Sequence, residues 1–200
     1  MIVIKSHIKA RETIKKYYPN IKVGITLSLH DIQAINGGEE RANKEWNDEF
    51  THYIPYLKDD DFFGLQNYSR TLIGPDGPEQ QEGKKLTQMG YENYPESLGH
   101  VIDRVYNELG LPILITENGI ATSDDNERVE FIDRALDGVK ICINKGIPVL
   151  GYMHWSTLDN FEWQKGFSMT FGLISVNRKT MQRTPKNSLY HLGKKVKLFN

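Results

Sequence analysis

Three apolar segments of this 200-residue chain end on side chains that can bind or react. Gln66 and Tyr68 lie at the end of the segment 61–68. Glu117 lies just beyond the segment 111–116, and Trp155 follows shortly after the segment 147–153. Placing a carboxylate at the end of a buried strand costs free energy unless its charge is paired or takes part in binding or catalysis. A positioned carboxylate can act as a nucleophile, an acid or a base, so Glu117 is the first candidate for a catalytic residue.

Aromatic and polar residues are mixed in the segment that follows the third of these strands. It reads "HWSTLDNFEWQKGF" over 154–167. Aromatic faces stack on the C–H faces of sugar rings, and carboxylates and amides bond to sugar hydroxyls. We therefore expect a carbohydrate site here. For Phe161 and Phe167 we favour packing in the core, since aromatic residues dominate cores.

Composition and motifs exclude several classes of function. The chain has 25 Lys+Arg against 26 Asp+Glu, a formal net charge of -1, which argues against nucleic-acid and membrane partners. No G-x-G-x-x-G, Walker or H-E-x-x-H pattern occurs, so we predict neither a cofactor nor a metal site. The single cysteine, Cys142, lies in a helical apolar pattern, and the opening residues do not resemble a secretory signal. Both observations favour a cytoplasmic protein.

The elements that must position these side chains follow an alternating order. We predict strands at 22–29, 61–68, 111–116 and 147–153. We predict helices at 3–17, 38–53, 95–109, 124–145 and 185–197. Strand followed by helix, repeated, indicates an α/β protein with a parallel sheet, in which ligands gather at the carboxyl ends of the strands. The segments 74–83 and 175–185 are rich in turn residues and are predicted to be surface excursions.

Several of these stretches resemble one enzyme family. "ITENGI", "WSTLDNFEW" and "FGLISVNRKTMQRTPKNSLY" resemble the carboxyl-terminal half of glycoside hydrolase family 1, the retaining β-glucosidases and their relatives. "DFFGLQNYSRTLIGPDGP" and "TQMGYENYPESL" are similar to a bacterial-type branch of that family. The resemblance covers essentially the whole chain, and the order and distance of "TENG" and "NFEW" make it specific.

The resemblance implies a role for seven residues. Glu117 matches the catalytic nucleophile, and Tyr68 matches the tyrosine whose hydroxyl bonds to it. Trp155 matches an aromatic wall under the sugar, and Glu162 and Trp163 match the pair that recognises its outer hydroxyls. Gln66 and Phe171 match further substrate-binding positions. Two departures leave substrate contacts open: Gln66 stands where the family often has Asn, and Thr170 where it often has Arg. The implied reaction is a two-step hydrolysis with net retention.

The resemblance also implies that part of the machinery lies outside this sequence. Retention requires a second carboxyl group about 5 Å from the nucleophile, and the family's "T-x-N-E-P" motif that carries it is absent. A TIM (β/α)8 barrel typically needs about 250 residues, whereas this chain has four predicted strands. We expect residues 1–200 to form a single domain equivalent to strands five to eight, a half-barrel.

Other interpretations stay open at this point. Glu117 precedes Asn-Gly and can be a polar residue ahead of a turn, and Tyr68 can be a packing tyrosine. His154 is not counted as catalytic, since a lone histidine on a strand is more often structural. The whole chain can be a non-catalytic carbohydrate-binding half-barrel, an inactive fragment, or one part of a β-glucosidase. As partners we expect a β-glucoside or related sugar, and either a complementary amino-terminal half or a second copy that closes an eight-stranded ring.

Overall fold

A four-stranded parallel sheet lies at the centre of the computed structural model, which describes residues 2–80 and 82–196. Its order is β1 (Thr26–Ser28), β3 (Phe63–Gln66), β6 (Ile113–Asn118) and β7 (Val149–His154), the order in which the strands occur along the chain. Each strand overlaps one of the four predicted segments, and all three neighbouring pairs are parallel. The predicted α/β class, built of consecutive parallel units, is confirmed.

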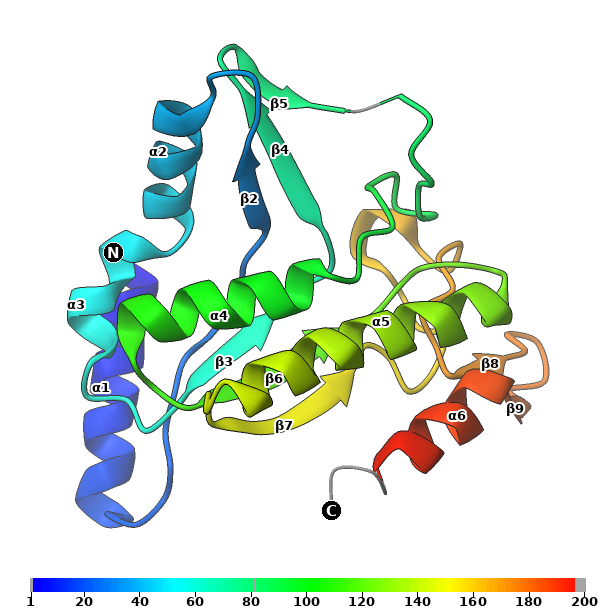
Figure 1. Cartoon of the computed structure of the whole chain (residues 1–200). Coiled ribbons are helices and arrows are strands. Elements are labelled where there is room, and N and C mark those ends of the chain that lie inside the picture. Colours follow the sequence, from blue (N-terminus) through cyan, green and yellow to red (C-terminus); the bar gives the residue numbers. More distant parts are fainter. Residues whose placement is uncertain (1, 81, 197–200) are drawn as a thin grey trace.

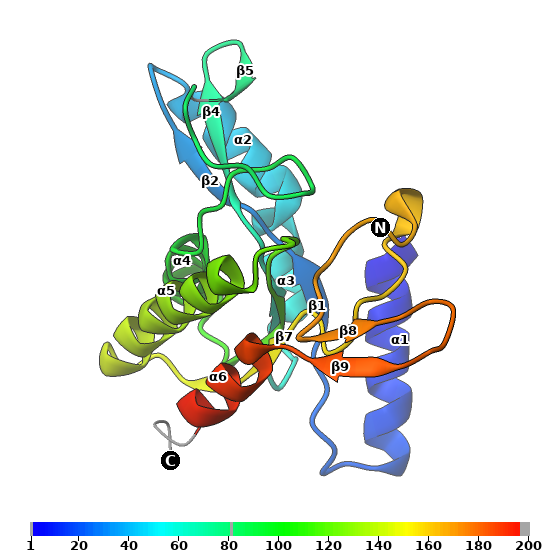
Figure 2. The same cartoon turned by 90° about the vertical axis from the view of Figure 1, so that its right-hand side faces the viewer.

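Helices connect these strands. They are α1 (Ile2–Tyr17), α2 (Glu39–Glu49), α3 (Ile54–Leu57), α4 (Ser97–Leu109), α5 (Asp125–Asn144) and α6 (Asn187–Val196). The helix predicted at 38–53 is shorter than expected, because α2 ends at Glu49 and a 3-10 turn, Thr51–Tyr53, leads into α3. The last residue of the helix predicted at 185–197 lies outside the described residues. In Figure 2, α4 and α5 lie on one side of the central strands and α1 on the other.

The boundaries of α4 and α5 follow from local chemistry. Asp124 caps α5 by accepting the backbone N–H of Asn126 at 2.9 Å. Gly110 ends α4 with a φ of 75°, the left-handed conformation that glycine adopts without strain. The two helices run side by side in Figures 1 and 2, and a Cβ on Gly99 would lie only 3.0 Å from the Cα of Gly138. Small residues therefore allow the two backbones to approach closely.

Two further sheets were not predicted. One has the order β2 (Asp31–Ala34), β4 (Arg70–Gly74), β5 (Gly77–Glu79), and the other pairs β8 (Ile174–Val176) with β9 (Arg183–Pro185). The segments 74–83 and 175–185 were predicted to be surface excursions, and the strands β5 and β9 within them are largely exposed; the prediction did not include their pairing with β4 and β8. These short hairpins are held by backbone hydrogen bonds, and β5 and β9 bury almost no side chains, so they leave no alternating apolar pattern in the sequence.

The core fills the space between the central strands and the helices. Phe63, Leu65, Ile113 and Ile115 are almost completely buried there. Cys142 is also buried, with its Sγ 3.3 Å from the carbonyl oxygen of Gly99, and burial raises the pKa of its thiol. The cysteine therefore has the character of an inert core residue. No helix in the described part of the chain is long and apolar enough to cross a membrane.

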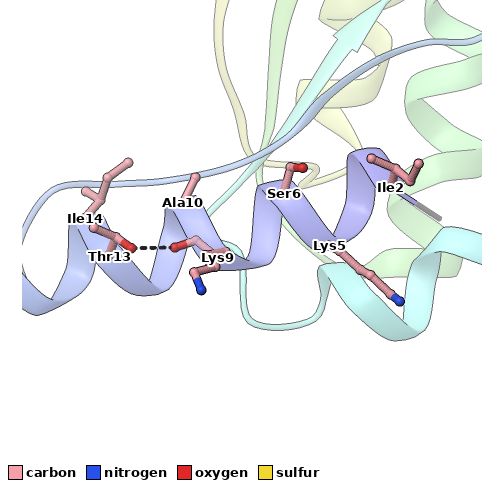
Figure 3. A pocket seen from close by; sticks show the side chains of 7 residues that line it. All are labelled: Ile2, Lys5, Ser6, Lys9, Ala10, Thr13 and Ile14. Carbon is pink, nitrogen blue, oxygen red and sulfur yellow. Dashed lines mark hydrogen bonds between the residues drawn. The ribbon is translucent and has the colours of Figure 1, made fainter.

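Both edges of the central sheet are unpaired within residues 2–80 and 82–196. β1 pairs only with β3, and β7 pairs only with β6. Leu150 and Met153 on β7 are 57% and 52% exposed. An open groove on α1, shown in Figure 3, is lined by Ile2, Lys5, Ser6, Lys9, Ala10, Thr13 and Ile14. Exposed apolar strands and helix faces of this kind mark surfaces that another element can cover.

Gly64 on β3 lets side chains of the flanking strands meet. The hydroxyl of Thr116 on β6 lies 2.6 Å from that of Thr26 on β1, two strands away. A Cβ on Gly64 would lie 2.7 Å from the Cβ of Thr26, closer than real Cβ contacts. The threonine contact therefore requires glycine between the two strands.

We expect Gly64→Ala to lower the free energy of unfolding by about 1–3 kcal/mol, the usual cost of overpacking. Gly193→Ala is the matched control, since a Cβ there meets no atom within 4 Å and lies in helix α6. Alanine in that helix should raise stability by about 0.5–1 kcal/mol. Urea denaturation of both variants measures the two effects, and equal stability of Gly64→Ala and the wild type would contradict this packing.

Candidate active site

Glu117 stands at the carboxyl end of β6 with a donor on each carboxylate oxygen. The Tyr68 hydroxyl donates to Oε2 at 2.6 Å, and the Gln66 amide donates to Oε1 at 3.0 Å. Both donors come from β3 and the residues just after it. Burial, together with the bond to Glu117, raises the pKa of Tyr68 far above its usual range, so its hydroxyl remains a donor. The carboxylate is thus oriented by two donors and only half buried.

An irregularity in β6 lies immediately before Glu117. Against β3, Leu65 pairs with Ile115 but Gln66 pairs with Glu117, so β6 contains one extra residue, Thr116. The pairing with β7 is also interrupted between Ile115 and Asn118. A bulge bends a strand and changes the direction of the side chains that follow it. Here it sets the side chain of Glu117 toward the donors from β3.

Gly119 allows the end of β7 to come close to the end of β6. The backbone N–H of Trp155 donates to the carbonyl of Asn118 at 2.8 Å. A Cβ on Gly119 would lie 1.9 Å from the carbonyl oxygen of Trp155, which no relaxation of a side chain could relieve. The peptide bond between Trp155 and Ser156 is cis. This approach brings the indole of Trp155 to the same rim as Glu117.

The loop after β7 carries Glu162 and Trp163. Lys165 N–H donates to the carbonyl of Glu162 at 2.6 Å and closes a tight turn. Trp163, within this turn, is 77% exposed. Burial raises the pKa of Glu162, and so does the charge of Glu117, against the opposing effect of a hydrogen bond from Trp155. Glu162 and Trp155 therefore lie at one site with Glu117, whereas the Trp163 side chain extends into solvent.

The loop is anchored at its base. The side chain of Asp159 accepts the Gly172 N–H at 2.8 Å and the Lys186 ammonium at 3.1 Å. The buried guanidinium of Arg128 donates to the carbonyl of Thr170 at 2.6 Å. Phe171, which follows Thr170, is buried with its ring edge-on to Tyr68 at a centroid distance of 6.1 Å. Phe171 therefore supports Tyr68 in this structure.

Sequence reasoning missed Tyr91 and Gln88, which lie between β5 and α4. Burial raises the pKa of Tyr91, as does the charge of Glu162, and Tyr91 in turn affects Tyr68, so it borders the same site. The Gln88 side chain accepts from both the N–H and the hydroxyl of Thr170, at 2.9 and 2.8 Å. No sequence pattern marks either residue, because residues 82–96 form no regular strand or helix that would give the sequence a period.

No group of three or more His, Cys, Asp or Glu side chains within the described ranges could hold a metal ion. What this arrangement provides is an oriented carboxylate, a second half-buried carboxyl, and aromatic side chains beside them. An oriented carboxylate can attack an electrophilic carbon, and the aromatic and carboxyl groups can bind a polyol. The geometry fits covalent catalysis on a sugar.

Comparisons with known proteins agree with this chemistry. The sequence profile described as Glycosyl hydrolase family 1 matches residues 48–198. The chain is 41% identical over 213 residues to Beta-galactosidase of Saccharolobus solfataricus, and the alignment covers 89% of this chain and 43% of that protein. It is 35% identical over 153 residues to Beta-glucosidase A of Thermotoga maritima, covering 68% of this chain and 34% of that protein.

Solved structures share the fold. The β-glycosidase BGL167 superposes with a TM-score of 0.93 at 43% identity, over 96% of this chain and 46% of that one. The apo β-glucosidase 1317 superposes with a TM-score of 0.89 at 40% identity, over 98% of this chain and 49% of that one. The chain therefore spans less than half the length of each of these proteins.

The coupling between the two carboxyl groups gives a titration test. Trp155→Phe removes the donor that lowers the pKa of Glu162, so this pKa should rise further above its ordinary value. Glu117→Gln removes the charge that raises it, so the pKa of Glu162 should fall. Trp163→Phe, at an exposed ring, should leave it unchanged. Carbon-13 NMR titration of the Glu162 carboxyl measures all three, and shifts of the same sign in the first two variants would contradict this geometry.

Proposed function

The chain belongs to glycosyl hydrolase family 1, and from that premise we propose that it supplies the nucleophile half of a retaining β-glycosidase active site. The observation that carries the proposal is the Glu117 carboxylate at the end of β6, held by Tyr68 and Gln66. This is the geometry a carboxylate nucleophile needs: fixed in direction and open to an incoming sugar.

The proposed first step is attack of a Glu117 oxygen on the anomeric carbon of a β-glycoside. A bond forms between that oxygen and the carbon, and the bond to the aglycone oxygen breaks, leaving a glycosyl ester on Glu117. Water then cleaves the ester and releases the sugar with its original configuration. Tyr68 and Gln66 hold the carboxylate so that only limited rearrangement is needed before attack.

We propose that the residues around Glu117 bind the sugar. Trp155 would stack under the ring, and the carboxyl group of Glu162 would accept hydrogen bonds from the sugar hydroxyls. Trp163 would contact the sugar from the exposed tip of the same loop. In this assignment Gln66 contributes to substrate binding through its bond to Glu117, and Phe171 through Tyr68.

The general acid would come from residues that this chain does not contain. The mechanism requires a second carboxyl about 5 Å from the nucleophile, and the family motif that carries it is absent from the sequence. The chain also spans less than half of its structural relatives. We propose that a complementary set of β/α units covers the free edges of β1 and β7 and brings the acid with it.

A second copy of the chain fits those edges less well electrostatically. Closing the ring with a copy would place α6 of one copy near α1 of the other. Lys5 and Lys9 line the groove on α1, and Lys194 is exposed in the last turn of α6. Like charges oppose this contact, whereas a complementary half with an acidic helix would be attracted.

The leaving group tests the missing acid. An aglycone with a low pKa needs little protonation, so the chain alone should turn over 2,4-dinitrophenyl β-glucoside slowly and methyl β-glucoside not measurably. Glu117→Gln should abolish the first activity. Comparable rates on both substrates would show that an acid is present, and Glu162→Gln would then identify whether Glu162 serves. Binding of glucose without any turnover would favour a carbohydrate-binding half-barrel.

Covalent trapping tests the nucleophile. A 2-deoxy-2-fluoro-β-glucosyl fluoride slows the second step more than the first, so the ester should accumulate on Glu117 and be found there by peptide mapping. Glu162→Gln is the paired variant, since it weakens sugar binding and should slow labelling while leaving its position unchanged. Label on another carboxylate, with none on Glu117, would refute the assignment.

A further inference from the structure

A chain of buried and partly buried side-chain hydrogen bonds crosses the carboxyl ends of all four central strands. The Asn67 amide donates to the carbonyl of Leu29, just beyond β1, at 2.9 Å. The Asn118 amide donates to the carbonyl of Asn67 at 2.7 Å, and the Tyr152 hydroxyl on β7 donates to Oδ1 of Asn118 at 2.9 Å. Nδ1 of His154 lies 3.0 Å from the same hydroxyl. The first three bonds link neighbouring elements of the sheet, and the contact between Tyr152 and His154 lies within β7.

The two asparagines are fully buried and fully used. Asn67 and Asn118 both have no exposed surface. Oδ1 of Asn67 accepts from the Ser97 hydroxyl at 2.8 Å, which ties the start of α4 to the chain of bonds. Leaving any one of these buried groups unpaired carries a substantial penalty, so the arrangement resists rotation of either amide.

These bonds act where the backbone ladder does not. Between β6 and β7 the pairing is interrupted from Ile115 to Asn118, the stretch that contains Glu117. Asn118 directly follows Glu117, and Asn67 lies between the two donors, Gln66 and Tyr68. Successive side chains of an extended strand point to opposite faces, so fixing the asparagines on one face fixes the direction of their neighbours on the other.

We propose that Asn67, Asn118, Tyr152 and His154 form a positioning network that holds Glu117 in line with Tyr68 and Gln66. It rests on the proposed function only in that Glu117 is taken as the nucleophile. None of the four touches the Glu117 carboxylate in the described structure. They act through the backbone segments that carry the carboxylate and its two donors.

The network has a defined direction. The Tyr152 hydroxyl has a single proton and gives it to Asn118, so the bond to His154 is donated by Nδ1–H, which leaves Nε2 as a bare acceptor. Nε2 is buried and has no hydrogen-bond partner among the described residues. Burial, with a smaller effect from the charge of Arg128, lowers the pKa of His154 to about 3, which keeps the ring neutral. Every bond then runs from β7 toward β1.

The tautomer and the Tyr68 hydroxyl proton can both be observed by NMR in the isolated full chain. In the wild type, nitrogen-15 shifts should show His154 protonated at Nδ1 and neutral at pH 6. The Tyr68 hydroxyl proton, in a bond of 2.6 Å, should appear as a downfield signal that Tyr68→Phe removes.

Tyr152→Phe keeps the ring and removes the hydroxyl at the centre of the network. We expect the hydroxyl proton of Tyr68 to exchange about fivefold faster or more, as expected for loss of one buried hydrogen bond. His154 should lose its preference for the Nδ1–H tautomer. Tyr190→Phe on α6 is the matched control, since this ring is exposed and should leave both signals unchanged.

Ser97→Ala tests the other end of the network. It is also the replacement variant if Tyr152→Phe does not fold. It removes only the bond to Asn67 and should also speed exchange of the Tyr68 proton. An unchanged Tyr68 signal in either folded variant, or a wild-type His154 protonated at Nε2, would overturn the proposal. These readouts do not depend on turnover or on labelling, so failure of the proposed function would leave them intact.

Discussion

The constraint on which the site depends is that a half-buried carboxylate must have both of its oxygens paired. Water is partly excluded from Glu117, so its charge is stabilised by donors from the protein. Tyr68 and Gln66 supply those donors, and both belong to β3 and its end. The parallel pairing of β3 with β6 is therefore what makes the site possible. The helices that bury these strands, α4 and α5, matter to the chemistry because they keep that pairing fixed.

A regular ladder would not by itself deliver Glu117 to these donors. The extra residue at Thr116 turns the strand, and Gly64 leaves room for Thr116 to reach Thr26 across β3. Gly119 then allows the backbone of Trp155 to come against the end of β6. Where the regular hydrogen-bonded pairing of the strands is lost, a close contact that only glycine permits compensates for the lost stabilisation. The geometry of the Glu117 carboxylate thus depends on residues that have no chemistry of their own.

Much of this organisation could be predicted from the sequence, and the reasons for the failures are physical. The four central strands are short apolar segments bounded by polar residues, and the α4 stripe of Leu98, Ile102 and Val105 has a helical period; both patterns reflect burial. The outer strands of the two hairpins, β5 and β9, bury little and left no such pattern. The place of Glu117 at the end of an apolar run made it a candidate, and the family resemblance implied its pairing with Tyr68, but the solvent exposure of Trp163 depends on a turn geometry that no spacing encodes.

The buried amides show a further limit of pattern reading. Asn118 precedes a glycine at a possible turn, and Asn67 lies near the end of a predicted strand, yet both are completely buried. Their role depends on partners 38 and 51 positions away, such as Leu29 and Asn67 itself. A sequence pattern shows which residues are polar, whereas only the fold shows which polar groups meet.

The two catalytic functions are separable for a structural reason. Every contact that orients Glu117 comes from β3, β6 or β7 and the segments next to them, all within this chain. Orientation of this carboxylate therefore requires no atom from elsewhere, whereas the proposed retaining mechanism also requires a carboxyl on the opposite side of the glycosidic bond to protonate the leaving group. Attack and protonation contribute separately to the barrier, and the need for protonation falls as the leaving group becomes more acidic. A chain that holds only the nucleophile can keep the first contribution in full while lacking the second.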